Sequence, residues 1–383
     1  MKVLLVTNYL PDKQASMIAF GRMLERELPR VGCDLRVVSP PDRVLRWAAA
    51  TSRWSKWLGY IDKFVLFIPM LRRQLRWADV VHVADHSNGM YIPWVTSKPN
   101  VVTCHDVIAI RAALRMITDW QVRWPGRQFQ RLVARGLGQA DLVACVSEMT
   151  RRDVLSLDLV QDRRLTMVPN GLNDNFAPVA PEEARALIAR MGLATPGPYL
   201  LHVGSAEVRK NRQGVLAAFI ALHKRAAQTG QAPMAQSLLF VGPKLSPEMA
   251  EQVQKHGMAD RIQTVQKVSH EELRALYSAA VGLLFPSLHE GFGWPVIEAQ
   301  ACGCPVFTSD LAPMNEIGGE GAVYVDPHDP PAMAAAMERA APRLAEMRRL
   351  GLDNAAHYGA EQMARRYKAA YERVMRERAE RPS

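Results

Sequence analysis

Residues 290–298 read Glu290-Gly-Phe-Gly-Trp-Pro-Val-Ile-Glu298, and they connect two apolar runs of the chain. The run Gly282–Phe285 precedes them, and the strand-like run Pro305–Thr308 follows. Between the runs, Pro295 suits the first position of a short helix, and Gly303 suits the position just after its end. The stretch therefore predicts a strand, a turn, a helix and another strand, which is the repeating pattern of an α/β fold.

The same alternation of apolar runs and amphipathic segments extends along the chain of 383 residues. In the N-terminal half we expect strands at Val3–Val6, Leu35–Val38, Val80–Val83, Val101–Cys104, Leu142–Val146 and Thr166–Val168. In the C-terminal half we expect them at Tyr199–Val203, Ser237–Val241, Ile262–Val265, Gly282–Phe285, Pro305–Thr308 and Ala322–Val325. These two series predict two Rossmann-like domains, residues 1–172 and 198–357, joined by a proline-rich linker, 173–197.

The formal net charge of +10 is confined to the N-terminal half. Residues 1–170 hold 25 Lys and Arg against 15 Asp and Glu, whereas residues 171–383 hold 23 of each kind. Such asymmetry indicates an anionic partner for the N-terminal half: nucleic acid, a membrane surface or a phosphorylated acceptor.

Several other classes of protein lack support in the sequence. No apolar run approaches the ~18 residues of a membrane span, and Lys2–Val6 is too short for the apolar part of a signal peptide. The five cysteines form no CxxC pair, which argues against zinc and disulfides and favours a reducing cytosol. Neither GxGxxG nor GxxxxGK occurs, and no two Asp residues are spaced i, i+2. We therefore expect no cofactor and no metal ion.

The glutamates at the two ends of the opening stretch suggest a ligand. A helix start offers unpaired backbone amides that attract phosphate, and glycines let a ligand approach the backbone closely. Glu290 before the bend and Glu298, expected in the first helical turn, could accept hydrogen bonds from a polyhydroxylated molecule. A diphosphate with a sugar at one end and a ribose at the other fits these groups. The alternative is that Glu298 only complements the helix dipole and Glu290 is a solvated loop residue.

The spacing Glu290-x7-Glu298 resembles the motif of family 4 glycosyltransferases, which are retaining enzymes of the GT-B fold. The segments Ser269–Tyr277, Phe285–Ser287 and Gly321–Pro327 are also similar to that family, and the resemblance covers nearly the whole chain. It implies that the C-terminal domain binds a nucleoside-diphosphate sugar. It also implies that a terminal helix, 360–378, packs back on the first domain.

The resemblance assigns roles within the opening stretch. Glu290 and the backbone amides around Phe292 and Gly293 would orient the sugar, and Glu298 would bind the ribose hydroxyls. The residues expected to bind the donor here are Glu290, Gly291, Phe292, Gly293, Trp294 and Glu298.

A second donor-binding segment is the loop Gly204-Ser-Ala-Glu-Val-Arg-Lys-Asn211, between a predicted strand and a helix. Asn211 is a plausible N-cap, which places Arg209 and Lys210 beside a helix N-terminus. The alternative is a pair of solvated charges. The loop is similar to the family's glycine loop, in which a basic pair grips the donor diphosphate. Many members carry Arg where this chain has Ser205, so Lys210 is the firmer assignment, and whether Arg209 supplies the second charge is left open.

His105-Asp106 ends the predicted strand Val101–Cys104, where a side chain is placed to face a ligand. The alternatives are a structural role for His105 and a capping role for Asp106. The run resembles the family's His-Asp motif, whose histidine contacts the transferred sugar, so His105 joins Lys210 and Glu290 as a catalytic candidate. Ser147 follows the next strand, where capping is an equal interpretation. The loop from Asn8 has no glycine before Gly21, unlike the family's, which implies an unusual acceptor pocket.

Residues 43–76 carry eight Lys and Arg and a single acid, Asp62. Aromatic and aliphatic residues recur there at helical spacing, and basic residues precede several of them by one position. This pattern suits an interfacial helix on an anionic membrane and equally a core-facing helix with a solvated basic side. No nucleic-acid-binding module accompanies the charge. The membrane or acceptor candidates are Arg46, Trp47, Arg53, Trp54, Lys56, Trp57 and Lys63, with Ile61, Phe64 and Ile68 completing the apolar stripe.

We therefore expect a cytoplasmic enzyme, peripheral on the inner face of the membrane. It would be a retaining, metal-independent GT-B hexosyltransferase that moves a sugar from a nucleoside-diphosphate donor to a glycan or lipid-linked acceptor in cell-surface polysaccharide or lipopolysaccharide synthesis. Two alternatives remain: a nucleotide-sugar epimerase of the same double Rossmann fold, and a non-catalytic protein that binds membranes or polysaccharide.

Overall fold

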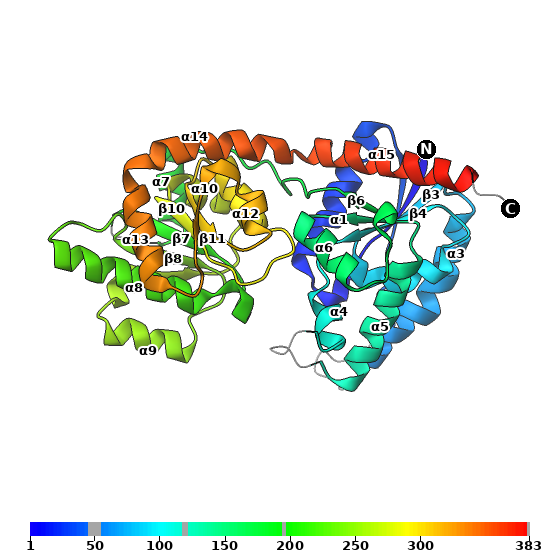
Figure 1. The fold of residues 1–383 in the computed structure, drawn as a ribbon, viewed down its shortest axis with the longest axis horizontal. Helices are drawn as coiled ribbons and strands as arrows, with labels where there is room; N and C mark the ends of the chain where they lie inside the picture. Colours follow the sequence, from blue (N-terminus) through cyan, green and yellow to red (C-terminus); the bar gives the residue numbers. More distant parts are fainter. Residues whose placement is uncertain (45–54, 117–121, 194–196, 381–383) are drawn as a thin grey trace. The chain divides into compact units, whose positions relative to one another are not determined.

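The computed structural model describes residues 1–44, 55–116, 122–193 and 197–380. It divides into two compact units (Figure 1). Unit 1 consists of Met1–Asn173 together with Ala360–Ser383, and unit 2 consists of Asp174–Gly359. Within the described residues each unit contains one six-stranded sheet, and every strand pairing in both sheets is parallel.

The strands of unit 1 lie in the order β2-β1-β3-β4-β5-β6. Their bounds are β1 Lys2–Val6, β2 Asp34–Val38, β3 Val80–Val83, β4 Asn100–Cys104, β5 Leu142–Cys145 and β6 Leu165–Met167. Each strand expected in this half is confirmed to within a residue at its ends. The central strands are buried along their whole length, as expected where helices cover both faces of a parallel sheet.

The helices of unit 1 are α1 Ala15–Glu27, α2 Ser55–Tyr60, a π-helical segment Ile61–Leu66, α3 Phe67–Leu75, α4 Ile108–Ala113, α5 Trp124–Gln139, α6 Glu148–Ser156 and α15 Ala360–Ala379. A 3₁₀ segment, His86–Trp94, follows β3. Phe67 and Leu71 of α3, Tyr91 of the 3₁₀ segment, and Val133 and Leu137 of α5 are buried against the sheet.

Helix α15 completes the core of unit 1 although it comes from the other end of the chain. The Tyr371 hydroxyl hydrogen-bonds to His82 Nδ1 at 2.7 Å, and Thr103 Oγ1 hydrogen-bonds to both His82 Nε2 and the Tyr367 hydroxyl at 2.8 Å. Burial lowers the pKa of His82 to about 3, so its ring is neutral and has one donor and one acceptor nitrogen. This buried chain of polar groups connects α15 to β3 and β4.

The strands of unit 2 lie in the order β12-β11-β10-β7-β8-β9. Their bounds are β7 Tyr199–Val203, β8 Ser237–Val241, β9 Ile262–Val265, β10 Gly282–Phe285, β11 Val306–Ser309 and β12 Ala322–Val325, which confirms the strands expected there. The chain builds outward from β7 to β9 and then returns to place β10 on the other side of β7. The loops after β7 and β10 therefore diverge, and such a switch point is where open α/β sheets bind ligands.

The helices of unit 2 are α7 Pro181–Arg190, α8 Arg212–Thr229, α9 Pro247–Lys255, α10 His270–Ala279, α11 Trp294–Ala301, α12 Met314–Ile317, α13 Pro330–Ala340 and α14 Leu344–Ala355. Helix α7 lies inside the segment 173–197 that the sequence suggested as a linker. Its residues Ala184 and Leu187 pack with Ala275 of α10, so the described part of this segment includes a packed element of unit 2.

Candidate active site

The candidate donor site of unit 2 is built on the two loops at the switch point. The loop from Gly204 follows β7, and the loop from Pro286 follows β10. The Leu288 amide donates to the Arg209 carbonyl at 2.8 Å, which connects the two loops through their backbones. A Cβ at Gly204 would lie 2.9 Å from His202 Nε2, so this position requires glycine for close packing at the strand end.

Asn211 fixes the loop after β7 from its far end. It caps α8, as the sequence predicted, because its side-chain oxygen accepts from the Gly214 amide at 3.2 Å. Its Nδ2 donates to the carbonyls of Pro286 at 3.0 Å and Pro327 at 2.8 Å. One side chain therefore holds together the loops after β7, β10 and β12.

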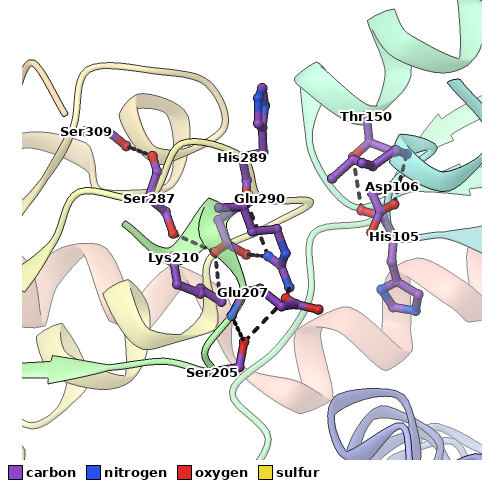
Figure 2. Close-up of polar contacts among 12 residues, drawn as sticks. His105, Asp106, Thr150, Ser205, Glu207, Lys210, Ser287, His289, Glu290 and Ser309 are labelled. Carbon is purple, nitrogen blue, oxygen red and sulfur yellow. Dashed lines mark hydrogen bonds and ion pairs between the residues drawn. The ribbon is translucent and has the colours of Figure 1, made fainter. Parts of the chain in front are cut away.

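The basic pair of the first loop contacts the first glutamate of the second loop (Figure 2). Lys210 Nζ lies 2.6 Å from Glu290 Oε1, and Arg209 Nη1 lies 2.8 Å from Glu290 Oε2. Ser287 Oγ also donates to Glu290 Oε1 at 2.8 Å. Glu290 is 8% exposed, so its charge is partly removed from water and is compensated by these three donors. The sequence did not suggest that Glu290 would be the counter-ion of the basic pair.

Glu207 is a second carboxylate in this network, and sequence reasoning did not assign it a role. Its Oε2 lies 2.6 Å from Arg209 Nη2, and its side chain is 54% exposed. Ser205, which stands where many family members have Arg, approaches Glu207 with a long hydrogen bond of 3.4 Å. Arg209 therefore bridges an exposed and a buried carboxylate.

Helix α11 begins as the sequence predicted, with Pro295 in its first turn. Gly293, the residue before the helix, has φ 101°, a left-handed conformation that favours glycine. A Cβ at this position would lie 2.4 Å from Met314 Cε. The ring of Phe292 is buried and meets that of Trp294 edge-on at 6.2 Å. The structure thus places Gly291, Phe292, Gly293 and Trp294 between Glu290 and the body of α11.

Glu298 is the fifth residue of α11 and lies just beyond the first turn where it was expected, because the helix starts at Trp294, one residue before Pro295. Its Oε2 accepts a hydrogen bond of 3.2 Å from the Tyr277 hydroxyl of α10. Burial raises the pKa of Glu298 to about 7, although the Tyr277 hydroxyl and the Lys210 charge act in the opposite direction. Ionisation of this carboxyl therefore occurs near neutral pH.

His105 of unit 1 is buried at the carboxyl end of β4. Its Nε2 hydrogen-bonds to the Ala84 carbonyl at 3.1 Å, and its ring meets Phe20 edge-on at 4.6 Å. Burial lowers the pKa of His105, so the ring is neutral near pH 7 and Nε2 carries the proton that it donates to Ala84.

Asp106 and Thr150 lie beside His105 (Figure 2), and the polar neighbours of this histidine have capping roles. Asp106 Oδ1 accepts from the Ile108 amide at 3.0 Å, which closes the turn before α4. Ser147 caps α6 by accepting from the Thr150 amide at 3.1 Å, so the capping interpretation is confirmed for both residues. Thr150 Oγ1 donates to the His105 carbonyl at 3.3 Å and connects α6 to the strand end.

A buried carboxylate at the switch point of unit 1 was missed by the sequence analysis. Asp85 follows β3 and is 2% exposed. Its Oδ2 accepts from Asn8 Nδ2 at 2.5 Å, its Oδ1 accepts from the Ser87 amide at 2.9 Å, and Oδ1 lies 3.2 Å from His86 Nδ1. Burial alone would raise the pKa of Asp85, but His86, His105 and Ser87 together outweigh it and hold the pKa well below its usual value. The rule that ligands meet strand ends could have singled out Asp85.

The segment proposed as an interfacial helix is only partly described. Arg46, Trp47, Arg53 and Trp54 lie outside the described residues, and so does the side chain of Lys56. Trp57 is 65% exposed, as the membrane interpretation requires. Lys63, however, pairs with Asp12 at 2.6 Å and is 15% exposed, so its charge is engaged within unit 1.

The exposed side of this helical segment has an apolar part and a basic part. Ile61 and Val65 follow Trp57 at intervals of four residues and are exposed. Beyond them, Arg72, Arg73 and Arg76 are exposed on α3 and the residue after it. In the described ranges, no helix combines the length and apolar character needed to cross a bilayer, and no three His, Cys, Asp or Glu side chains form a group suited to a metal ion.

Both units match models of glycosyltransferases. Residues 22–176 match Glycosyltransferase Family 4, and residues 197–341 match Glycosyl transferases group 1. The chain belongs to the family 4 glycosyltransferases. Its solved relatives share the GT-B fold, and neither the epimerase nor the binding-protein alternative gains support from the comparisons.

This glycosyltransferase is similar to O-antigen chain mannosyltransferase B of Escherichia coli, with 26% identity over 74% of the chain and 73% of the relative. Other E. coli relatives match over less than a third of their own length. Sucrose-phosphate synthase from Thermosynechococcus elongatus matches with a TM-score of 0.73 and 21% identity, covering 98% of the chain and 100% of that structure. Anabaena HepE in complex with UDP-glucose matches with a TM-score of 0.71 and 13% identity, over 97% and 99%.

The raised pKa of Glu298 predicts a pH-dependent effect of Glu298→Gln on stability. The unfolded carboxyl ionises near its ordinary pKa and the folded one near 7, so ionisation destabilises the native state as pH rises between these values. Glutamine removes this penalty, which is on the order of 3 kcal/mol above neutral pH. We expect the ligand-free variant to have a higher Tm than the wild type at about pH 8.5 and a similar Tm at about pH 5. A difference in Tm that is the same at both pH values would contradict a raised pKa.

Proposed function

We propose that the protein is a retaining, metal-independent hexosyltransferase that acts in cell-surface polysaccharide synthesis. It transfers a sugar from a nucleoside-diphosphate donor to a glycan or lipid-linked acceptor. The observation that carries this proposal is the group of Lys210, Arg209 and Glu290 at the switch point of unit 2. Two cations beside a helix start form a site for a diphosphate, and a carboxylate beside them can accept sugar hydroxyls.

The two cations would stabilise the leaving group of the reaction. Lys210 Nζ has three N–H donors and directs one toward Glu290, so other donors remain for phosphate oxygens. As the bond between the sugar and the phosphate breaks, negative charge grows on the departing diphosphate, and fixed cations favour that transition state. In the front-side mechanism, the acceptor oxygen bonds to the sugar carbon on the face that the phosphate leaves, and the phosphate takes the acceptor's proton.

The remaining candidates would position the donor. Glu290 and the backbone around Phe292 and Gly293 would orient the sugar, and Glu298 would accept hydrogen bonds from the ribose. In unit 1, His105 is proposed to contact the transferred sugar with its neutral ring. The Asn8–Asp85 pair, at the switch point of that unit, supports a role for this strand edge in holding the acceptor.

The comparisons suggest the class of substrate. One structural neighbour is described with UDP-glucose, and the E. coli relative is named as a mannosyltransferase of the O-antigen chain. GDP-mannose and UDP-glucose are therefore the first donors to test. A membrane-bound acceptor agrees with the exposed stripe of unit 1, in which apolar Trp57, Ile61 and Val65 precede Arg72, Arg73 and Arg76. We propose that this stripe holds the enzyme on the cytoplasmic face of an anionic membrane.

Lys210→Ala should lower the rate of sugar transfer about 10²-fold, because a charge-assisted contact in the transition state is worth roughly 3 kcal/mol. Release of nucleoside diphosphate from GDP-mannose and UDP-glucose, with membrane lipids supplied as acceptor, measures this rate. Tm should fall moderately, because buried Glu290 loses one of three donors, while Arg209 and Ser287 still compensate it and keep the protein folded. The control is Lys255→Ala, which removes an exposed lysine of α9. Near-normal transfer by Lys210→Ala would remove this lysine from the mechanism.

Metal chelation should leave the transfer rate unchanged. We expect Arg209 and Lys210 to take the diphosphate in exchange for their carboxylate partners and so to fill the place that a divalent cation has in metal-dependent enzymes. The same release assay in excess EDTA tests this expectation. Inactivation by EDTA with recovery on adding Mg²⁺ or Mn²⁺ would show that a metal ion takes part.

Replacing Arg72, Arg73 and Arg76 by Glu should abolish co-sedimentation with phosphatidylglycerol vesicles at low salt. Attraction to anionic lipid is about 1 kcal/mol per basic residue at the surface and weakens with salt. Replacing Lys244, Lys255 and Lys267 of unit 2 by Glu makes the same charge change and should leave vesicle binding intact. Both variants should keep the rise in Tm caused by nucleotide. If the wild type does not bind the vesicles, or both variants lose binding equally, the stripe is not the membrane-binding surface.

A further inference from the structure

The charges around Arg209 cancel in the ligand-free protein. Among the described residues, Arg209 and Lys210 form ion pairs with two carboxylates, Glu207 and Glu290. A donor diphosphate carries at least two negative charges, but the cations that would bind it are already paired with carboxylates. For the diphosphate to bind, at least one carboxylate must therefore be replaced by a phosphate oxygen.

The two carboxylates differ in how firmly they are held. Glu290 is buried and accepts hydrogen bonds from Lys210, Arg209 and Ser287. Glu207 has an exposed side chain whose short contact is the ion pair with Arg209, and its carboxylate accepts one long hydrogen bond of 3.4 Å from Ser205 Oγ. An exposed ion pair of this kind exchanges at little cost, because water solvates the released carboxylate. Glu207 is thus the carboxylate that an incoming anion can replace.

We infer that Glu207 is an internal competitor for the donor diphosphate at Arg209. Its carboxylate occupies the guanidinium in the ligand-free protein, is displaced when the diphosphate binds, and returns as the product leaves. Arginine binds carboxylate and phosphate oxygens through the same planar set of N–H donors, so the two anions exclude each other at Nη2. This inference rests on the proposed function, because it assumes that the loop binds a nucleoside diphosphate.

The competition acts most strongly on the product. In the donor, the terminal phosphate is esterified to the sugar, whereas in the released nucleoside diphosphate it is joined only to the inner phosphate, so a further oxygen ionises near pH 7 and adds negative charge. The product is therefore attracted to Arg209 and Lys210 more strongly than the donor is. A carboxylate that reoccupies Arg209 opposes this excess attraction and speeds product release. In this role Glu207 is a positioning residue of the donor loop, with no contact to the reacting atoms.

Calorimetric titration of the full-length protein with GDP and UDP tests the inference. At low salt, Glu207→Gln should bind the nucleoside diphosphate about 2- to 5-fold more tightly than the wild type, and the difference should shrink at high salt. For the sugar nucleotide that binds, GDP-mannose or UDP-glucose, the increase in affinity caused by Glu207→Gln should be smaller than for the nucleoside diphosphate. The nucleoside diphosphate should also become a stronger product inhibitor. Glu251→Gln, which removes an exposed carboxylate of α9, is the matched control and should leave affinity unchanged.

The outcomes separate this inference from the proposed function. If the wild type binds a nucleoside diphosphate and Glu207→Gln binds it equally or more weakly, Glu207 is not a competitor, and the proposed function stands. An equal increase in affinity for the nucleoside diphosphate in Glu251→Gln would show that removing any negative charge from the protein has this effect, and it would also overturn the inference. If neither nucleotide binds to the wild type or to Glu207→Gln, the proposed donor site itself is wrong. Because the side chain of Glu207 is exposed, the Tm of Glu207→Gln should match that of the wild type, and this measurement checks that the variant folds.

Discussion

The donor side of the protein depends on the burial of one carboxylate. An ionised Glu290 at 8% exposure is stable only if strong donors surround it, and it has Lys210 and Arg209 from the loop after β7 and Ser287 from its own loop. The need to compensate this charge fixes the distance between the two loops. The basic residues proposed for the diphosphate are thereby held in place before any ligand arrives, so less ordering is required on binding.

The fold could be read from the sequence because its strands are short, apolar and separated by turn residues. Each strand of the two sheets was predicted, since a parallel sheet covered on both faces produces continuous apolar runs. Helix α7 was missed because its few buried positions, such as Ala184 and Leu187, lie in a segment rich in proline. Its existence depends on packing against α10, which a single segment does not reveal.

The site was predicted less completely than the fold. Capping by Asn211 is local, so sequence spacing suffices to find it. The contact of Lys210 with Glu290 joins residues 80 positions apart and depends on the strand order that makes β7 and β10 neighbours. Asp85 could have been noted from its place after β3, but its hydrogen bond with Asn8, 77 positions away, depends on the fold. Glu298 was placed in the first turn and lies one residue beyond it, because residue types predict that a helix begins but locate its first residue only to within a residue or two.

The position of α15 in unit 1 has a consequence for synthesis of the protein on the ribosome. The sheet of unit 1 is complete once residue 173 has been made, but the polar groups of His82 and Thr103 lack their tyrosine partners until α15 appears. Roughly 190 residues lie between these points, and at ~5–20 residues per second they take about 10–40 s to translate. All of unit 2 emerges during that interval. The half of the chain that is made first is therefore the last to reach its final packing, and its α15-binding surface stays exposed to solvent or to chaperones in the meantime.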